Sequence, residues 1–324
     1  MRDLQENRKF LIPSEWQAIA VIAIHLALPA IWPGPLGWLQ GLVPVPVCYY
    51  LVKLGQTKAN SILINAILFA GIAALIFGSL PAFIFTCTML PVGLIIGKSH
   101  LSEVSPPRAG LQAVGILVLL WIAFWTTYGS MTQTNPYQEM LTSMDASLTT
   151  VSSMYQSDTS LSLNDKEEIA NTIKMLRDFM QQIAPGLLLM TAIITVWLNL
   201  LLGQWIINRK LPSQSTWPPY RLWRLPEQLI WVVIGGGFMA IIPAAGFSAI
   251  GKNILLAIGT LYFFQGIAVL AKLFAKWSIP RPMRVFLFAI AILQGAGFFA
   301  LAVIGIADIW VNFGTPRPDS DPVE

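Results

Sequence analysis

The chain alternates between long apolar stretches and short polar connections. Nine stretches come close to the roughly 20 residues that an α-helix needs to cross the hydrocarbon of a bilayer. A transmembrane β-strand would need only about 10 residues of alternating polarity, a pattern that these stretches lack. The pattern therefore predicts membrane-spanning helices at Trp16–Trp32, Leu36–Leu54, Ser61–Leu80, Ala82–Gly97, Leu111–Tyr128, Pro185–Ile207, Leu229–Ala249, Ile254–Phe274 and Val285–Trp310.

The second span is the weakest of the nine, because Pro44 and Pro46 interrupt it. A re-entrant loop at this position would reduce the count to eight spans. The fold class predicted in both cases is all-α, a polytopic bundle of transmembrane helices.

A long polar segment separates the fifth and sixth spans and carries two helical patterns. Asn135 and Pro136 are typical of a helix start, and apolar residues then recur at steps of three and four as far as Tyr155. Asn164 with Glu167 indicates a second start. We therefore expect an external αα-hairpin. It is either an extension of the neighbouring spans or a lid over an outward-facing pocket, with methionines as an adaptable surface.

These elements divide the chain into four parts. Residues 1–129 form an N-terminal membrane half with five spans, and residues 130–184 form the hairpin. Residues 185–313 form a C-terminal membrane half with four spans, and residues 314–324 form a polar tail.

Composition and charge support a membrane location and give an orientation. Hydrophobic residues make up 55% of the chain and charged residues 11%, against about 25% charged in soluble domains. If the N-terminus is cytoplasmic, 15 of the 20 basic residues fall on the cytoplasmic side. The C-terminus is then external, and the net charge of +4 reflects topology rather than nucleic-acid binding.

Two segments at the membrane surface have further roles in this interpretation. Basic residues precede the first span, but no clean cleavage site follows it, so we expect an uncleaved anchor. The cytoplasmic segment Leu211–Glu227 is rich in Trp, Pro and Arg. It is expected to lie at the lipid interface as an amphipathic anchor, or else to dock a partner.

Polar side chains inside the predicted spans are the candidates for binding. Asn199, Gln265 and Gln294 lie in the middle of three spans and could converge on a ligand. The simpler role is a hydrogen bond that joins neighbouring helices. Asp308 lies near the predicted outer end of the last span. It is interpreted either as an interfacial carboxylate or as a proton or cation site.

Proline breaks give a second set of candidates. Pro44, Pro46 and Pro91 interrupt short spans, where freed carbonyl groups and helix ends can face a solute in transporters. Tolerated kinks are the alternative. The predicted substrate-binding set is therefore Asn199, Gln265, Gln294, Asp308, Pro44, Pro46 and Pro91.

Nothing in the sequence indicates an enzyme. The chain lacks the nucleotide-binding P-loop, the metalloprotease motif and the nucleophile elbow. Cys48, Cys87, His25 and His100 are too few and too scattered for a zinc site, and no catalytic set or cofactor is predicted.

Several runs carry a family resemblance. Tyr262–Val269, Pro280–Arg284 and Gly305–Phe313 resemble the bacterial YybS-like family of membrane proteins, and so do Pro35–Pro46 and Asn135–Gln138. The hydropathy is also similar to that of the substrate-binding subunits of energy-coupling-factor transporters. Those subunits couple through small residues, and Ala23 with Ala27 has the same spacing.

Two functions follow as hypotheses. The first is a membrane protein that binds or moves a small solute together with a partner ATPase, as the resemblance implies. The second is a scaffold without transport, which holds protein partners through the hairpin and the cytoplasmic segment. Membrane lipid is expected around both, and nucleic acid around neither.

Overall fold

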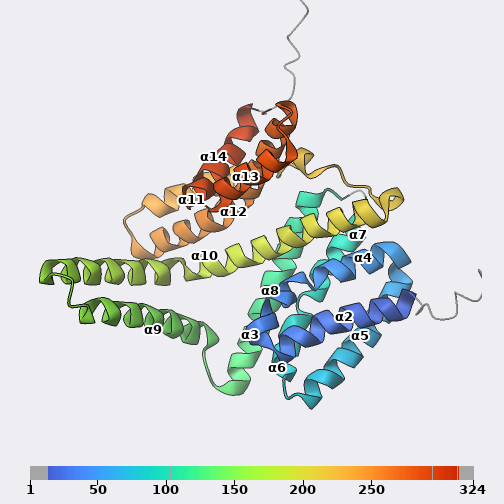
Figure 1. The fold of residues 1–324 in the computed structure, drawn as a ribbon, viewed down its shortest axis with the longest axis horizontal. Helices are drawn as coiled ribbons and strands as arrows, with labels where there is room; N and C mark the ends of the chain where they lie inside the picture. The colour runs from blue at the N-terminus through green and yellow to red at the C-terminus, as the bar shows by residue number, and fades with distance from the viewer. Residues whose placement is uncertain (1–13, 103, 294, 312, 314–324) are drawn as a thin grey trace, which may run out of the picture. The chain divides into compact units, whose positions relative to one another are not determined.

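In the computed structural model, which describes residues 14–102, 104–293, 295–311 and 313, the described residues form helices and no strand (Figure 1). By their contacts the helices form two compact units, Met1–Phe124 with Ile194–Pro219 (unit 1) and Trp125–Ile193 with Tyr220–Glu324 (unit 2). In chain order the α-helices and the longest 3-10 helix are α2 (Ser14–Ile31), α3 (Pro33–Leu36), η1 (Gly37–Leu42), α4 (Pro44–Leu54), α5 (Gln56–Ile76), α6 (Leu80–Cys87), α7 (Leu90–His100), α8 (Pro106–Thr132), α9 (Pro136–Ser157), α10 (Leu163–Lys210), α11 (Ile230–Ile241), α12 (Ala245–Lys276), α13 (Arg281–Leu293) and α14 (Gly295–Val311).

Each predicted span overlaps one or more helices, but several cross a helix break and the count of nine is not confirmed. Among the described residues, six helices are long and apolar enough to cross a membrane, or seven if α13 and α14 together form one span. The predicted first and seventh spans correspond to the shorter apolar helices Glu15–Ile31 and Glu227–Ile241. The 12 residues of α11 cover about 18 Å, whereas the hydrocarbon is about 30 Å thick. This helix ends early because Pro243, which cannot donate a backbone hydrogen bond, lies in the break before α12.

In unit 1, α5 has one face for its neighbours and one for lipid. The small side chains of Ala66, Ala70 and Ala74 are at most 1% exposed, and α5 packs closely against α2. Small residues at such contacts let helix backbones approach one another. On the other face Ile64, Leu68, Ile72 and Leu75 are more than half exposed, as expected of side chains that contact lipid.

The predicted hairpin is formed by α9 and α10 in unit 2. Asn135 accepts a hydrogen bond from the Gln138 backbone N–H, which confirms the predicted cap of α9. The second cap differs from the prediction, because Ser162 and Asp165, not Asn164 and Glu167, exchange reciprocal hydrogen bonds. In this arrangement the hydroxyl and the carboxylate each satisfy a free N–H of the first turn.

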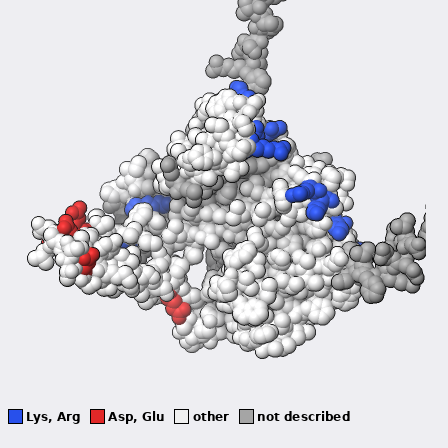
Figure 2. All heavy atoms as spheres, in the orientation of Figure 1, with Lys and Arg blue, Asp and Glu red and all other residues white. Residues whose placement is uncertain are grey.

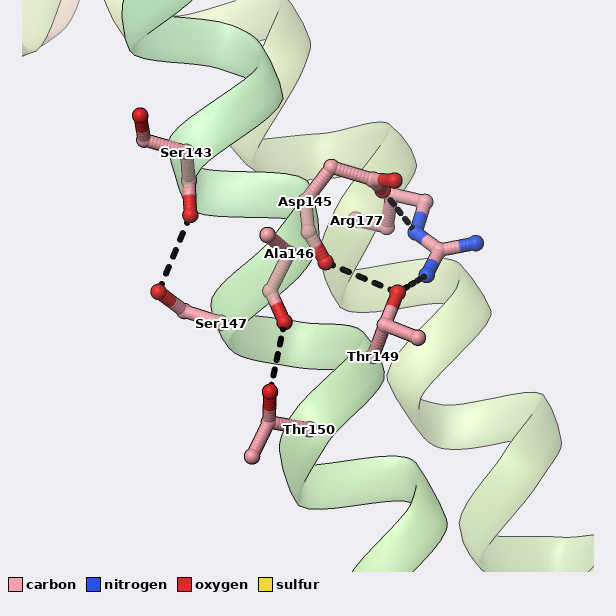
Figure 3. Close-up of polar contacts among 7 residues, drawn as sticks. All are labelled: Ser143, Asp145, Ala146, Ser147, Thr149, Thr150 and Arg177. Carbon is pink, nitrogen blue, oxygen red and sulfur yellow. Dashed lines mark hydrogen bonds and ion pairs between the residues drawn. The ribbon is translucent and has the colours of Figure 1, made fainter.

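One ion pair joins the two hairpin helices (Figure 3). Arg177 of α10 lies 2.5 Å from Asp145 of α9, and its guanidinium also donates to the Thr149 hydroxyl. Figure 2 shows acidic side chains gathered at the end of unit 2 where α9 meets α10. That the hairpin lies outside the membrane remains a prediction.

The second hairpin helix and the predicted sixth span are one continuous helix. α10 has 48 residues and passes Pro185 without ending. At this proline, the Asn253 side chain of α12 accepts a hydrogen bond from the Gly186 N–H and donates to the Gln182 carbonyl oxygen. These two backbone groups are i and i+4 in α10, so the Asn253 amide bridges them beside Pro185.

Glycines allow α12 to approach two other helices closely. A methyl group at Gly251 would overlap the backbone of Ala240 in α11. Similarly, a methyl group at Gly266 would overlap the Leu301 carbonyl of α14, and one at Gly305 would overlap the Tyr262 carbonyl. The close contact between α12 and α14 places the residues beside these glycines, Gln265 and Asp308, within reach of each other.

Candidate functional site

Gln265 connects three segments of unit 2. Its amide nitrogen donates to Asp308 Oδ2 of α14 at 3.1 Å. Its amide oxygen accepts from the backbone N–H of Leu225, in the segment before α11, also at 3.1 Å. Both halves of the amide are therefore used, and the residue is only 8% exposed. Gln265 fixes the Leu225 segment and the Asp308 carboxylate to the same point of α12.

Asp308 is a buried carboxylate with both oxygens occupied. It is 5% exposed, and Oδ1 accepts from the Phe313 backbone N–H at 3.0 Å while Oδ2 accepts from Gln265. The guanidinium of Arg224 lies 3.8 Å from Oδ2, which is longer than a hydrogen bond of about 2.9 Å. The cation therefore balances the charge while its donors remain available to other groups.

The segment that carries Arg224 is anchored on its other side by Tyr220. The Tyr220 hydroxyl donates to the Phe264 carbonyl oxygen at 2.6 Å. Burial raises the pKa of this phenol, so the hydroxyl stays neutral and remains a donor. The Tyr220 ring also meets the Trp223 ring edge-on, with 5.2 Å between the centroids. Anchors at Tyr220 and Leu225 thus bracket Arg221 and Arg224.

These residues surround a cavity of about 230 Å³, which we call the Asp308 pocket. Apolar side chains, among them Trp223 and Val269, form part of its wall. The polar part consists of Gln265, Asp308 and three cationic residues, Arg221, Arg224 and Lys272. A concave apolar site with a few converging polar groups is the usual form of a small-molecule site.

The position of Asp308 conflicts with the predicted orientation of the last span. The charge pattern assigns Arg224 to the cytoplasmic side and Asp308 to the outer end, yet their side chains are 3.8 Å apart. The helices Arg281–Ala291 and Gly295–Val311 are bent by 106° relative to each other, which fits a broken span or a re-entrant loop. A helix pair with this bend does not carry Asp308 straight across the bilayer from Arg281.

Asn199, another predicted site residue, lies in unit 1 with its partners. It is 1% exposed, and its amide nitrogen donates to the carbonyl oxygens of Gly41 and Thr195 at 2.6 and 2.7 Å. Gly41 belongs to the 3-10 helix η1, which has carbonyl groups to satisfy. The contacts of Asn199 and Gln265 lie in different units, and Gln294 lies outside the described residues.

The three predicted prolines occupy the starts of helices in unit 1. Pro44 and Pro46 lie in the first turn of α4, and Pro91 lies in the first turn of α7. A proline costs little there, because the first-turn N–H groups have no partner inside the helix. α4 and α7 pack closely, and a methyl group at Gly93 would lie 2.7 Å from the Pro44 carbonyl oxygen. That carbonyl therefore faces a neighbouring helix.

The sequence analysis did not assign the cationic residues of the pocket to a site. Arg221, Trp223 and Arg224 were interpreted as part of an interfacial anchor. A signal was nevertheless present, because Gln265, Val269 and Lys272 follow one another at steps of four and three on one face of α12. Among the residues that the structure describes, no three acidic, His or Cys side chains are grouped to hold a metal ion.

The long apolar helices and the buried carboxylate define the class as a multi-pass α-helical membrane protein. Within this class, the chain belongs to the family described as "Predicted membrane protein (DUF2232)", whose model matches residues 20–309. The match extends from α2 through Asp308 and so includes every residue of the Asp308 pocket. No curated protein and no solved structure matches the chain.

Proposed function

We propose that this protein binds a small solute in the Asp308 pocket and acts as the substrate-binding subunit of a transporter. The observation that carries the proposal is a buried carboxylate, fixed by Gln265 and the Phe313 N–H, in the wall of a cavity. Buried ionisable groups in the helices of membrane proteins are costly and usually mark a binding site or pathway. The hydrogen bonds hold the carboxylate in place before any ligand arrives, which lowers the entropy lost on binding.

In this proposal the chain performs no catalysis, and energy comes from a partner ATPase. The similarity in hydropathy to energy-coupling-factor subunits supports that arrangement. The bacterial inner membrane follows from the resemblance to the YybS-like family, and the cytoplasmic N-terminus from the charge pattern. In this proposal Ala23 and Ala27 form the contact surface for the partner. Both are half-buried, whereas Ile22 and Leu26 of the same helix α2 are buried. Small residues left at a helix surface allow another helix to approach closely.

The experiment is a stability screen of the purified protein in a neutral detergent. Soluble small molecules of positive, negative and zero charge are added singly, and the midpoint of thermal unfolding, Tm, is recorded. A ligand at 100 times its Kd stabilises the folded state by about 2.7 kcal/mol. We expect at least one solute to raise the Tm of the wild type.

Two variants link the rise in Tm to the pocket. Gln265→Met keeps the side-chain volume but removes both hydrogen bonds, so the rise should vanish. Asn65→Leu is the matched control, because the Asn65 amide of α5 is exposed and donates only to Ser61 of its own helix. An equal rise in all three proteins, or no rise with any solute, would contradict the proposal.

One observation favours a scaffold as a second candidate function. α9 buries none of its residues, and large apolar side chains of the hairpin, such as Val151, Tyr155 and Phe179, are more than 40% exposed. Contiguous exposed apolar surface often marks a contact with another protein. If the chain is a scaffold, replacing these three residues by Ser should abolish crosslinking to partners and leave solute binding unchanged.

A further inference from the structure

The charges around the Asp308 pocket narrow the class of ligand. Three cationic side chains, Arg221, Arg224 and Lys272, line it with one carboxylate, which leaves an excess of two positive charges. Within the described part of the chain, the side chains of Arg221 and Lys272 make no hydrogen bond or ion pair. The pocket therefore offers cationic donors that the protein does not use itself.

The carboxylate does not offer a comparable site for a cation. Each Asp308 oxygen already accepts one hydrogen bond, from Gln265 or from the Phe313 N–H, and the residue is only 5% exposed. Any cationic ligand would also face three like charges at short range, which is unfavourable in a partly buried site. Asp308 acts instead on Arg224, because its charge at 3.8 Å attracts the guanidinium without forming a hydrogen bond that would occupy its donors.

From this arrangement we propose that the Asp308 pocket binds a phosphate group, with Arg221, Arg224 and Lys272 as its ligands. The inference rests on the proposed function, since it names the ligand class of the same pocket. A phosphate group presents several strong acceptor oxygens, enough for three separate cations, and Arg can engage two of them at once. Trp223 and Val269 in the wall suit a phosphate that is joined to an apolar group.

Two sources can supply such a group, a soluble phosphate ester and the headgroup of an anionic phospholipid. Basic pockets between membrane helices near the cytoplasmic surface are a known form of headgroup site. The two sources share their chemistry at the pocket and differ in whether the ligand arrives from water or from the bilayer.

The experiment therefore has two arms, both on the full chain. In the first, glycerol phosphate is titrated into detergent-purified protein and binding is followed by calorimetry. In the second, the protein is placed in nanodiscs of phosphatidylcholine with a minor share of phosphatidic acid, and native mass spectrometry records the retained lipid. Discs of phosphatidylcholine alone give the baseline.

The variants are Lys272→Gln and Arg224→Gln, with Lys276→Gln as the matched control. Lys276 belongs to the same helix and is exposed, but it does not line the pocket. Each lost charge-assisted hydrogen bond should weaken phosphate binding by about tenfold, and Lys276→Gln should bind like the wild type. Arg224→Lys, which keeps the charge, should retain part of the affinity if Arg224→Gln proves unstable.

The outcomes separate this inference from the proposed function. Saturable binding in either arm that falls in Lys272→Gln and not in Lys276→Gln supports the phosphate site, and the responding arm identifies the source. Equal phosphate binding by Lys272→Gln and Lys276→Gln overturns it, and so does an absence of phosphate binding. If neutral solutes then bind in a manner that depends on Gln265, the proposed function survives; if no solute binds, both fail.

Discussion

The Leu301 carbonyl oxygen of α14 lies over the Cα atom of Gly266 in α12, in the space that any larger residue would need for its Cβ. The Gly305 Cα similarly faces the Tyr262 carbonyl. This mutual contact sets the distance between the two helices, and the Gln265–Asp308 hydrogen bond depends on that distance.

The first prediction is that Gly266→Ala destabilises unit 2. The added methyl group must push two backbones apart, which should lower the free energy of unfolding by about 1–3 kcal/mol. Thermal unfolding in detergent measures the change. Gly259→Ala in the same helix is the control, since no atom lies within 4 Å of its added methyl group. An equally large fall in the unfolding free energy of Gly259→Ala would show that the effect comes from replacing a glycine within α12 and not from the contact with α14.

The second prediction concerns the loop that Gln265 holds. Gln265→Met leaves the Leu225 N–H and an Asp308 oxygen without this partner, at a cost of about 1–3 kcal/mol. Hydrogen exchange at the Leu225 amide should become faster, while exchange in the hairpin should stay at the wild-type rate. Unchanged exchange at Leu225 would mean that Tyr220 alone anchors the segment.

A third prediction follows from the pairing of Arg224 with Asp308. Arg221→Cys and Val311→Cys, each in a background without Cys48 and Cys87, should react with a membrane-impermeant thiol reagent from the same side of the membrane. Phe247→Cys should react from the other side, because α12 extends about 38 Å from this residue to Lys272. If Val311→Cys instead reacts from the same side as Phe247→Cys, the last span crosses the membrane straight and this prediction is wrong.

The fourth prediction concerns the Asn253 side chain, whose amide bridges two backbone groups of α10. Asn253→Ala removes the partner of the Gln182 carbonyl and the Gly186 N–H, which should cost about 1–3 kcal/mol in unfolding free energy. The added flexibility should appear as faster proteolysis near Pro185. Asn65→Ala is the control with a similar side chain but no bond to another helix, and its cleavage rate should equal that of the wild type.

The fifth prediction concerns the ion pair of the hairpin. Both partners are partly exposed, Arg177 by 34% and Asp145 by 42%, so Arg177→Ala should cost at most about 1 kcal/mol. Added salt should weaken the wild-type hairpin and have less effect on the variant. Lys174→Ala, one turn earlier on the same helix, is the control. If Arg177→Ala and Lys174→Ala respond equally to salt, the effect comes from the net charge of the hairpin and not from the Arg177–Asp145 ion pair.

Much of the helical layout could be predicted from the sequence, because the hydropathy of each span is a local property. The cap at Asn135 was also predictable, since its signal lies within four residues. The second cap was placed at Asn164 because two capping patterns, Ser162 with Asp165 and Asn164 with Glu167, overlap in one short stretch. Local patterns alone do not decide between them.

The pocket was predictable only in part, because its residues come together through helix crossings. Gln265 and Asp308 were identified as polar residues in apolar surroundings, but their hydrogen bond depends on Gly266 and Gly305. The charge pattern also implied that every span crosses the bilayer fully. The 3.8 Å between Arg224 and Asp308 does not fit the opposite sides that this pattern predicts for the two residues.

Asn253 belongs to the same helix as Gln265, about 18 Å away along its axis. Swinging the α9–α10 hairpin about Pro185 would pull Gln182 and Gly186 away from the Asn253 amide, and Gln182 away from the neighbouring Lys252, both of α12. A force that acts on the distal end of the hairpin therefore has to break these hydrogen bonds first, and their donors and acceptors on α12 belong to the helix that also lines the Asp308 pocket.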